Sequence, residues 1–263
     1  MSRTHRRGDP GGPPLRLPRP VGALGGLLAI ESPCLTARDP IHLHPTAPLA
    51  DRVLLPGDPG RALMLAQTLL QEPKMFNHHR GLWGYTGTAP DGEPITIQAT
   101  GMGGPSAAIV MTELIALGAT RAVRVGTCGA LSRELRLGEL IVASEAVCGD
   151  GTSVALGAGE RVAADSALTG SLARATPGCR VGSVVSVDLF YEDGPPGQGR
   201  EGLAVEMEAA ALFAVGAREK IPVGCLLTVT DVFSGSGRRR IEDHMLLSCA
   251  EQMGAAAIAA LSA

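Results

Sequence analysis

The chain has 263 residues, enough for one large α/β domain or two small ones, and its apolar fraction of 45% supports a substantial core. Its formal net charge is −3, so neither a nucleic acid nor an anionic membrane is expected as a partner, because both favour a basic face. No segment is expected to be long and apolar enough to span a bilayer. The six cysteines are widely spaced, form no C-x-x-C pair and have mostly apolar neighbours. They indicate buried thiols in a reducing, cytoplasmic setting rather than a zinc or redox site, and no metal or other cofactor is expected.

Residues 1–39 differ from the rest of the chain, because they are rich in proline, glycine and arginine and lack any helical or alternating period. They predict a disordered extension that precedes a single domain over residues 40–263. An apolar run at residues 21–30 follows Arg6 and Arg7, which is the outline of an export signal. Because glycines interrupt this run and Glu31-Ser-Pro33 is a poor cleavage site, export is not expected.

The first expected strand, residues 53–55, breaks into a Pro/Gly turn that leads into a helix beginning near Arg61. This arrangement suits an anion, because Gly57 permits close approach to the backbone, the N–H groups of the turn are free to donate and Arg61 offers a charged donor fork. A solvated connection between strand and helix is the alternative interpretation, and this motif alone does not decide between the two.

Beyond this turn, short β-rich runs alternate with longer runs rich in alanine and leucine. Helices are expected at residues 62–70, 105–117, 164–175, 206–218 and 241–261. Strands are expected at residues 83–87, 94–98, 121–125, 139–147, 181–187 and 222–229, the first two joined as a hairpin through Asp91-Gly92. The alternation predicts an α/β fold, in which a largely parallel or mixed sheet is covered by helices on both faces.

Charged residues stand where ligands collect in such folds, at the carboxyl ends of the expected strands. Arg124 ends one strand, Glu206 and Glu208 lie at a strand-to-helix junction, and Asp231 follows another strand. Each has a structural alternative: Arg124 at a sheet edge, the glutamates as favourable charges at a helix N-terminus, and Asp231 as an N-cap. Their common position favours a binding or catalytic site over these separate structural roles.

Seven short segments occur in order along the chain: PGDPGR at 56–61, HRG at 79–81, TGMGGPS at 100–106, RVGTCG at 124–129, DLFY at 188–191, VEMEAA at 205–210 and TVTD at 228–231. Together they resemble the nucleoside phosphorylase family, and most closely its hexameric bacterial branch that acts on purine nucleosides. The resemblance implies a three-layer α/β/α fold with a central mixed, partly barrel-like sheet. It also implies reversible cleavage of purine nucleosides by phosphate, which is a co-substrate and not a cofactor.

The resemblance also assigns residues to phosphate. Gly57, Arg61, Arg124 and Thr127 would contact it, and Arg80 would reach the phosphate bound by a neighbouring subunit. Several arginines suit this task, because bidentate guanidinium contacts both hold and orient a phosphate dianion against the anomeric carbon. The assembly implied is a homo-hexamer, a trimer of dimers, in which neighbours complete each other's sites.

The nucleoside would be bound by residues from several segments. Glu208 would accept hydrogen bonds from the ribose hydroxyls, which a carboxylate with several lone pairs suits, and His42 of a neighbour would approach the 5′-hydroxyl. The remaining residues assigned to ribose or base are Met207, Phe190, Tyr191, Val205, Glu206 and Thr230.

Catalysis requires departure of a purine anion, and protonation of N7 removes its charge. The resemblance makes Asp231 the general acid, and apolar surroundings would help it to keep its proton. An arginine downstream would assist. The loop after Asp231 is shorter than the family pattern and leaves three candidates, Arg238, Arg239 and Arg240, of which Arg238 is preferred.

Uridine phosphorylase is the closest alternative, because Gln198 and Arg200 stand where that enzyme carries a uracil-reading pair. Asp231 favours a purine, since uracil has no N7 to protonate. A nucleosidase that uses water would not need Arg61, Arg80 and Arg124 together. A non-catalytic nucleoside-binding or sensor protein is the alternative from a different functional class.

Overall fold

The computed structural model describes residues 39–191, 197, 199–234 and 237–263. The extension expected over residues 1–39 therefore lies outside the described residues, except for Asp39. The strands are β1 Arg52–Pro56, β2 Gln71–Asn77, β3 Gly84–Thr88, β4 Pro94–Gln98, β5 Arg121–Ala130, β6 Leu140–Gly149, β7 Arg161–Ala163, β8 Arg180–Val187, β9 Ala204–Glu206, β10 Val223–Ser234 and β11 Gly237–Arg240. The helices are α1 Pro59–Leu69, α2 Gly104–Ala116, α3 Gly151–Ala155, α4 Ser166–Ala175, α5 Ala209–Glu219 and α6 Asp243–Ser262, with a 3₁₀ turn, η1, at His79–Gly81.

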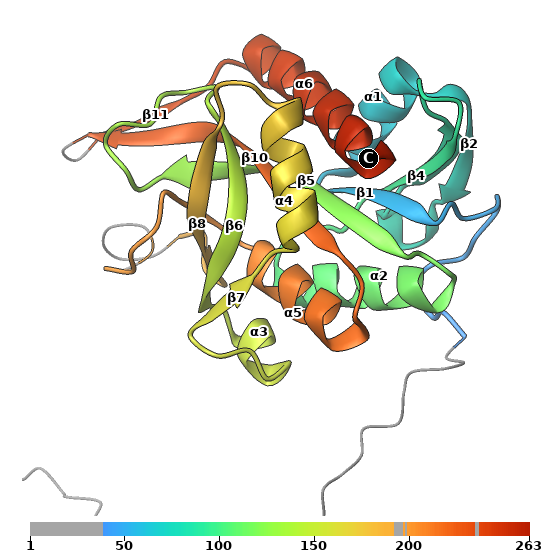
Figure 1. The fold of residues 1–263 in the computed structure, drawn as a ribbon, viewed down its shortest axis with the longest axis horizontal. Coiled ribbons are helices and arrows are strands. Elements are labelled where there is room, and N and C mark those ends of the chain that lie inside the picture. Colours follow the sequence, from blue (N-terminus) through green and yellow to red (C-terminus); the bar gives the residue numbers. More distant parts are fainter. Residues whose placement is uncertain (1–38, 192–196, 198, 235–236) are drawn as a thin grey trace, which may run out of the picture. The chain divides into compact units, whose positions relative to one another are not determined.

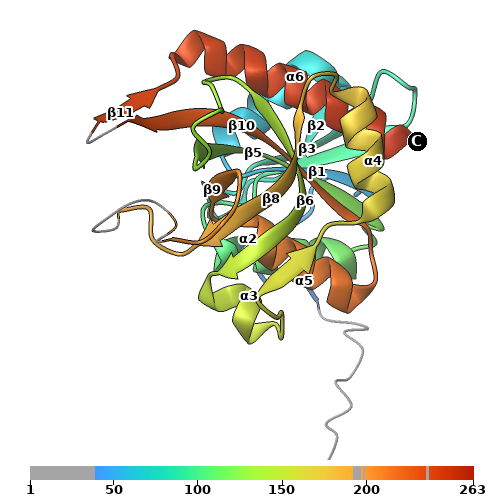
Figure 2. The same ribbon diagram turned by 60° about the vertical axis from the view of Figure 1, so that its left-hand side comes forward.

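These strands form one mixed sheet that closes partly on itself (Figures 1 and 2). β10 pairs with both β5 and β6, β6 pairs with β8, β8 with β9, and β9 with β5, which completes a ring of five strands. β1 extends this barrel in parallel with β5, and β4, β3 and β2 continue from β1. The predicted central mixed, partly barrel-like sheet is confirmed.

Helices cover both faces of the sheet and make the predicted three layers (Figure 1). α1 and α4 pack against α6 on one side, whereas α2, α3 and α5 pack together on the other. Each side has its own apolar core: Leu65, Leu172 and Met253 belong to the first, and Met111 and Phe213 to the second.

The turn after β1 is fixed by local capping. Asp58 is the N-cap of α1 and accepts a hydrogen bond from Gly60 N at 2.8 Å, and Pro59 occupies the first helical turn, where its missing N–H costs nothing. The helix therefore begins at Pro59 and not near Arg61, so that Arg61 belongs to the first turn of α1.

Two strands are longer than the sequence predicts. β5 continues through Gly126 to Ala130, since both β10 and β9 pair with this stretch, and Arg124 lies within the strand and not at its end. β10 likewise extends to Ser234, with an irregularity between Val229 and Asp231. The helix expected at 206–218 begins only at Ala209, because Glu206 belongs to β9. In each case the ladder between neighbouring strands overrides local glycine and helix propensity.

α6 corrects one expectation about membranes. By length and composition it is apolar enough to cross a bilayer, which no segment was expected to be. One such helix is weak evidence, because a core helix passes the same test. Its residues Ala250, Met253, Ala257 and Leu261 are buried in the core shared with α1, so packing accounts for its composition.

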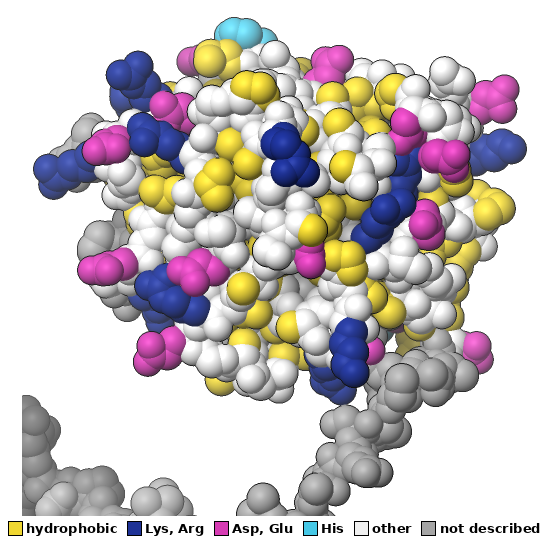
Figure 3. Space-filling model, viewed as in Figure 1, with side chains coloured by type: hydrophobic (Ala, Val, Ile, Leu, Met, Phe, Trp, Pro, Cys, Tyr) yellow, Lys and Arg dark blue, Asp and Glu magenta, His cyan; other side chains and the backbone are white. Residues whose placement is uncertain are grey.

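Charges are mixed on the face shown in Figure 3, where Lys and Arg side chains are interspersed with Asp and Glu. Opposite charges at short spacing cancel beyond about one Debye length, roughly 8 Å in physiological salt. This face therefore offers no concentrated positive potential for a polyanion.

Candidate active site

A cavity of about 540 Å³ is lined by residues within β5 and β10 and by residues at or just after the ends of β1 and β9. Most of the site residues expected from the sequence line it, although they come from distant parts of the chain. Those residues are Gly57, Arg61, Arg124, Thr127, Phe190, Val205, Glu206, Met207, Glu208, Thr230, Asp231 and Arg238. His42, Arg80 and Tyr191 are not part of the lining.

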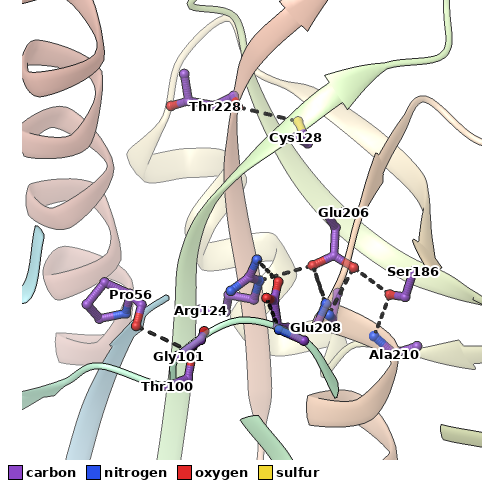
Figure 4. Close-up of polar contacts among 12 residues, drawn as sticks. Pro56, Thr100, Gly101, Arg124, Cys128, Ser186, Glu206, Glu208, Ala210 and Thr228 are labelled. Atoms are coloured by element: carbon purple, nitrogen blue, oxygen red, sulfur yellow. Dashed lines mark hydrogen bonds and ion pairs between the residues drawn. The ribbon is translucent and has the colours of Figure 1, made fainter. Parts of the chain in front are cut away.

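Arg124 is buried between two carboxylates (Figure 4). Its Nε donates to Glu206 Oε2 at 3.1 Å, and its Nη2 donates to Glu208 Oε2. Gly126 makes room for the guanidinium, because a Cβ at Gly126 would lie 2.8 Å from Cζ and Nη2 of Arg124. Burial by itself would lower the pKa of Arg124, but Glu208 and Glu206 outweigh burial and hold that pKa above its ordinary value. Arg124 is thus a fixed cation.

The third nitrogen of this guanidinium, Nη1, is buried and has no hydrogen-bond partner among the described residues. It faces the turn after β1, since a Cβ on Gly57 would lie 3.9 Å from it. Arg61 lines the same cavity; burial lowers the pKa of Arg61, Asp58 opposes this, and the charge of Arg124 adds to it. Two neighbouring guanidiniums and an unpaired buried donor form a site suited to an anion.

Glu206 has both oxygens occupied by protein donors. Besides Arg124, it accepts hydrogen bonds from Ser186 Oγ and from the backbone N–H groups of Glu208, at 2.9 Å, and Ala209, at 2.9 and 3.0 Å. Burial raises the pKa of Glu206, and Arg124 opposes that rise. Sequence reasoning assigned Glu206 to the base side, whereas the structure engages it with Arg124 and the start of α5.

Glu208 is less fully occupied. Its Oε1 accepts a hydrogen bond from Gly103 N at 2.6 Å, and its Oε2 accepts from Arg124. Because each carboxylate oxygen has two lone pairs, Glu208 keeps acceptor capacity toward the cavity. Gly103 has a φ of +85°, which glycine adopts without strain and which turns its N–H toward this carboxylate.

Asp231 lines the same cavity in a polar setting, not the apolar one expected. Thr230 Oγ1 donates to its Oδ2 at 2.9 Å, and Arg238 Nε donates to its Oδ1 at 2.8 Å. The β10–β11 hairpin places Phe233 opposite Arg238 and brings Arg238 back to Asp231. Arg239 and Arg240 are exposed and form no ion pair within the described part of the chain, so Arg238 is the candidate that contacts the aspartate.

Two phenylalanines stand beside this pair. Cζ of Arg238 lies 5.0 Å from the ring centroid of Phe190, a cation–π contact. Phe233 lines the cavity with its ring against β5, because a Cβ on Gly129 would lie 3.2 Å from Phe233 Cε2. Tyr191 is 90% exposed and outside the lining. Sequence reasoning missed Phe233, although its position two residues after Asp231 places both on one face of a strand.

His42 and Arg80 lie together away from this cavity. His42 Nδ1 is 2.6 Å from Glu113 Oε1, and its backbone carbonyl is 3.1 Å from His79 Nδ1. Arg80, next in the chain to His79, is exposed and has a φ of +57°, an uncommon conformation for a residue with a side chain. Neither residue reaches the cavity of its own chain.

The cysteines partly match their prediction. Cys128, which lines the cavity, and Cys225 are buried, and burial raises the pKa of both thiols, whereas Cys148, Cys179 and Cys249 are half-buried. Cys34 lies outside the described residues. Within those residues, no group of three or more His, Cys, Asp or Glu side chains is arranged to hold a metal ion.

The sheet contains a five-stranded barrel and has helices on both faces, and one cavity holds the buried Arg124 and the Asp231–Arg238 pair. A family model described as the phosphorylase superfamily matches residues 51–262, and the chain belongs to this family. Similar curated proteins carry the name purine nucleoside phosphorylase DeoD-type. The one from Oceanobacillus iheyensis is 38% identical over 195 residues, 70% of this chain and 83% of the relative. The one from Geobacillus kaustophilus is 38% identical over 201 residues, 71% and 83% respectively, and that from Clostridium beijerinckii 36% identical over 209 residues, 73% and 86%.

Proposed function

We propose that this protein catalyses the reversible phosphorolysis of purine ribonucleosides and deoxyribonucleosides, which yields the free base and a pentose 1-phosphate. It is thus a pentosyltransferase of purine salvage. One observation carries the proposal: a buried nitrogen of Arg124, which has no partner among the described residues, lies in a cavity that also contains Arg61 and the Asp231–Arg238 pair. The names of the curated relatives support the same activity.

Phosphate is proposed to bind at the Arg124 side of the cavity. Nη1 of Arg124, the guanidinium of Arg61, the backbone of Gly57 and the hydroxyl of Thr127 would donate to its oxygens. Arg124 cannot turn away to follow the anion, because Glu206 and Glu208 hold its other nitrogens. A preoriented donor of this kind holds the nucleophile against the anomeric carbon without reorganisation.

The nucleoside would lie between phosphate and Asp231. Glu208 accepts hydrogen bonds from the ribose hydroxyls, Met207 supports the sugar, and Phe190 with Val205 and Thr230 borders the base. Asp231 gives its proton to N7 as the glycosidic bond breaks, so that a neutral purine leaves an oxocarbenium-like ribosyl centre. Arg238, which donates to Asp231, stabilises the carboxylate that forms.

The site is proposed to be completed by a second copy of the chain in a homo-hexamer built as a trimer of dimers. Neither His42 nor Arg80 lines the cavity of its own chain, which supports a role for both residues at a neighbour's site. Activity should then fall on dilution below the assembly threshold, in parallel with subunit mass by light scattering. A fully active monomer would contradict this assembly. The domain is proposed to span residues 40–263 and the enzyme to act in the cytoplasm.

A pyrimidine nucleoside is the competing substrate. Of the pair that suggested uracil recognition, Gln198 lies outside the described residues, and Arg200 packs against Gly149, where a Cβ would lie 3.0 Å from its Nε. Arg200 is not part of the cavity lining. Asp231 lines the cavity and favours a purine substrate, because uracil has no N7 to accept its proton.

The experiment is a panel of inosine, guanosine, adenosine and uridine, incubated with purified protein with and without phosphate. Purine bases should be released only with phosphate, and uridine should be cleaved far more slowly. Equal release without phosphate would indicate hydrolysis. Binding without release from any of the four would favour the nucleoside-binding or sensor function.

A further inference from the structure

Ser186 is a fully buried serine of β8 whose hydroxyl has a single possible orientation. Its Oγ accepts a hydrogen bond from Ala210 N at 2.9 Å and donates to Glu206 Oε1. An amide N–H can only donate, so the one hydroxyl proton must go to Glu206. The bond is therefore a charge-assisted donation to the carboxylate, which is stronger than one between neutral groups.

Glu206 transmits this restraint to Arg124. Its Oε2 accepts from Arg124 Nε at 3.1 Å, while its Oε1 is held by Ser186 and Ala209 (Figure 4). The guanidinium is planar, so fixing Nε and Nη2 fixes the direction of Nη1 as well. Nη1 is the nitrogen without a partner among the described residues.

The start of α5 is occupied by the same network. The N–H groups of Ala209 and Ala210, which have no partner within the helix, donate to Glu206 and Ser186 instead. They are thus not free to bind an anion, although a helix N-terminus commonly does so. The positive end of this helix stabilises Glu206, and the unpaired donor for a ligand is that of Arg124.

We propose that Ser186 is a positioning residue for phosphate, acting through Glu206 to aim Nη1 of Arg124 at the cavity. The proposal rests on the phosphorolysis proposed above. Ser186 touches neither substrate, and its role is to orient the donor for one of them.

The test is Ser186→Ala, with Ser153→Ala as a matched control. Ser153 is as fully buried as Ser186 and also donates to a carboxylate, Asp150 Oδ1, at 2.6 Å. Ser153 and Asp150 are both outside the cavity lining. Ser186→Ala should raise the KM for phosphate about tenfold, as expected for loss of one charge-assisted hydrogen bond, and leave the KM for nucleoside within about twofold. Ser153→Ala should leave both constants unchanged even if it lowers Tm. An unchanged phosphate KM in folded Ser186→Ala, or equal rises in both constants, would overturn the proposal.

Glu206→Gln provides a second test that separates orientation from charge. It removes a negative charge near the anion, so a purely Coulombic role predicts tighter phosphate binding. Orientation predicts weaker binding, because a glutamine NH₂ group cannot accept from the surrounding donors. Calorimetric titration of the folded variant with inorganic phosphate distinguishes the two roles, and phosphate binding tighter than that of the wild type would overturn the proposal. If the wild-type protein releases base without phosphate, the proposed function itself fails. If the wild-type protein requires phosphate but the variants bind phosphate as the wild type does, only the positioning role of Ser186 fails.

Discussion

Arg238 and Asp231 are joined across a hairpin, with Nε of the arginine donating to Oδ1 of the aspartate at 2.8 Å. The contact links β11 to β10 at the edge of the cavity, and the same guanidinium lies 5.0 Å from the ring centroid of Phe190. Arg238 therefore connects the proposed general acid to the wall of the proposed base site.

Arg238→Ala should lower kcat for inosine about tenfold, because the carboxylate formed on proton transfer loses a charge-assisted hydrogen bond. The KM for phosphate should change little, since phosphate is proposed to bind at the other side of the cavity. Arg239→Ala and Arg240→Ala are the matched controls, as both side chains are exposed. Steady-state kinetics of the three variants decides, and equal losses in all three would argue against a specific role for Arg238.

Asp231→Asn should lower turnover of inosine about 100-fold or more, the range typical of a lost general acid. Nucleosides methylated at N7 carry the positive charge already, so their base leaves without protonation. Turnover of 7-methylinosine should therefore fall far less than that of inosine. Rates for both substrates with the same variant give the answer, and parallel losses would show that Asp231 serves the fold or the ribose and not N7.

Phe233→Ala should raise the KM for purine nucleosides about fivefold and leave the KM for phosphate unchanged, since an aromatic wall supplies apolar area and stacking to the base. Phe233 lines the cavity, whereas Tyr191 is 90% exposed and does not. Tyr191→Ala is the comparison, with a smaller expected effect. A larger effect at Tyr191 would place the base on the side that sequence reasoning predicted.

Asp91 provides a test of stability against pH. Arg52 donates to it through Nη2 at 2.7 Å, Ser262 of α6 donates as well, and the bond from Arg52 holds the pKa of Asp91 below its ordinary value. A lowered native pKa stabilises the fold above the unfolded pKa, about 3.9, and this contribution is lost as the pH falls through the native pKa.

Asp91→Asn should accordingly lower the free energy of unfolding by about 1 kcal/mol at pH 7, a value kept small because the carboxylate is partly exposed. The difference from wild type should shrink at pH 3. Asp51→Asn, which removes only an exposed pair with Arg121 at 3.9 Å, is the control and should have little effect. Urea unfolding at both pH values measures this, and a difference that is no smaller at pH 3 than at pH 7 would count against the ion pair.

The sequence predicted the layers of the fold because hydrophobic period and chain order carry that information. Strand ends were harder to predict. The strand expected at residues 121–125 stops before Gly126, yet Gly126 lies within β5, and its missing side chain leaves space for the guanidinium of Arg124. β9 and β11 are short and polar or glycine-flanked, so only pairing with distant strands defines them.

The site shows the same division between local and long-range information. Motifs placed Arg61, Arg124 and Asp231 at one cavity, but which atoms remain free depends on packing between elements far apart in the chain. Ser186 illustrates this, because no local pattern marks a serine whose only proton is directed at Glu206 from another strand. Contact between Arg238 and Asp231, and none from Arg239 or Arg240 within the described residues, likewise follows from the geometry of the hairpin.

Phosphorus NMR of the purified protein with inosine and inorganic phosphate shows whether phosphate is the nucleophile. A new phosphate monoester resonance, that of ribose 1-phosphate, should appear and grow in proportion to the hypoxanthine released, while inorganic phosphate declines. Release of hypoxanthine and free ribose with no phosphate ester formed would contradict phosphate as the nucleophile.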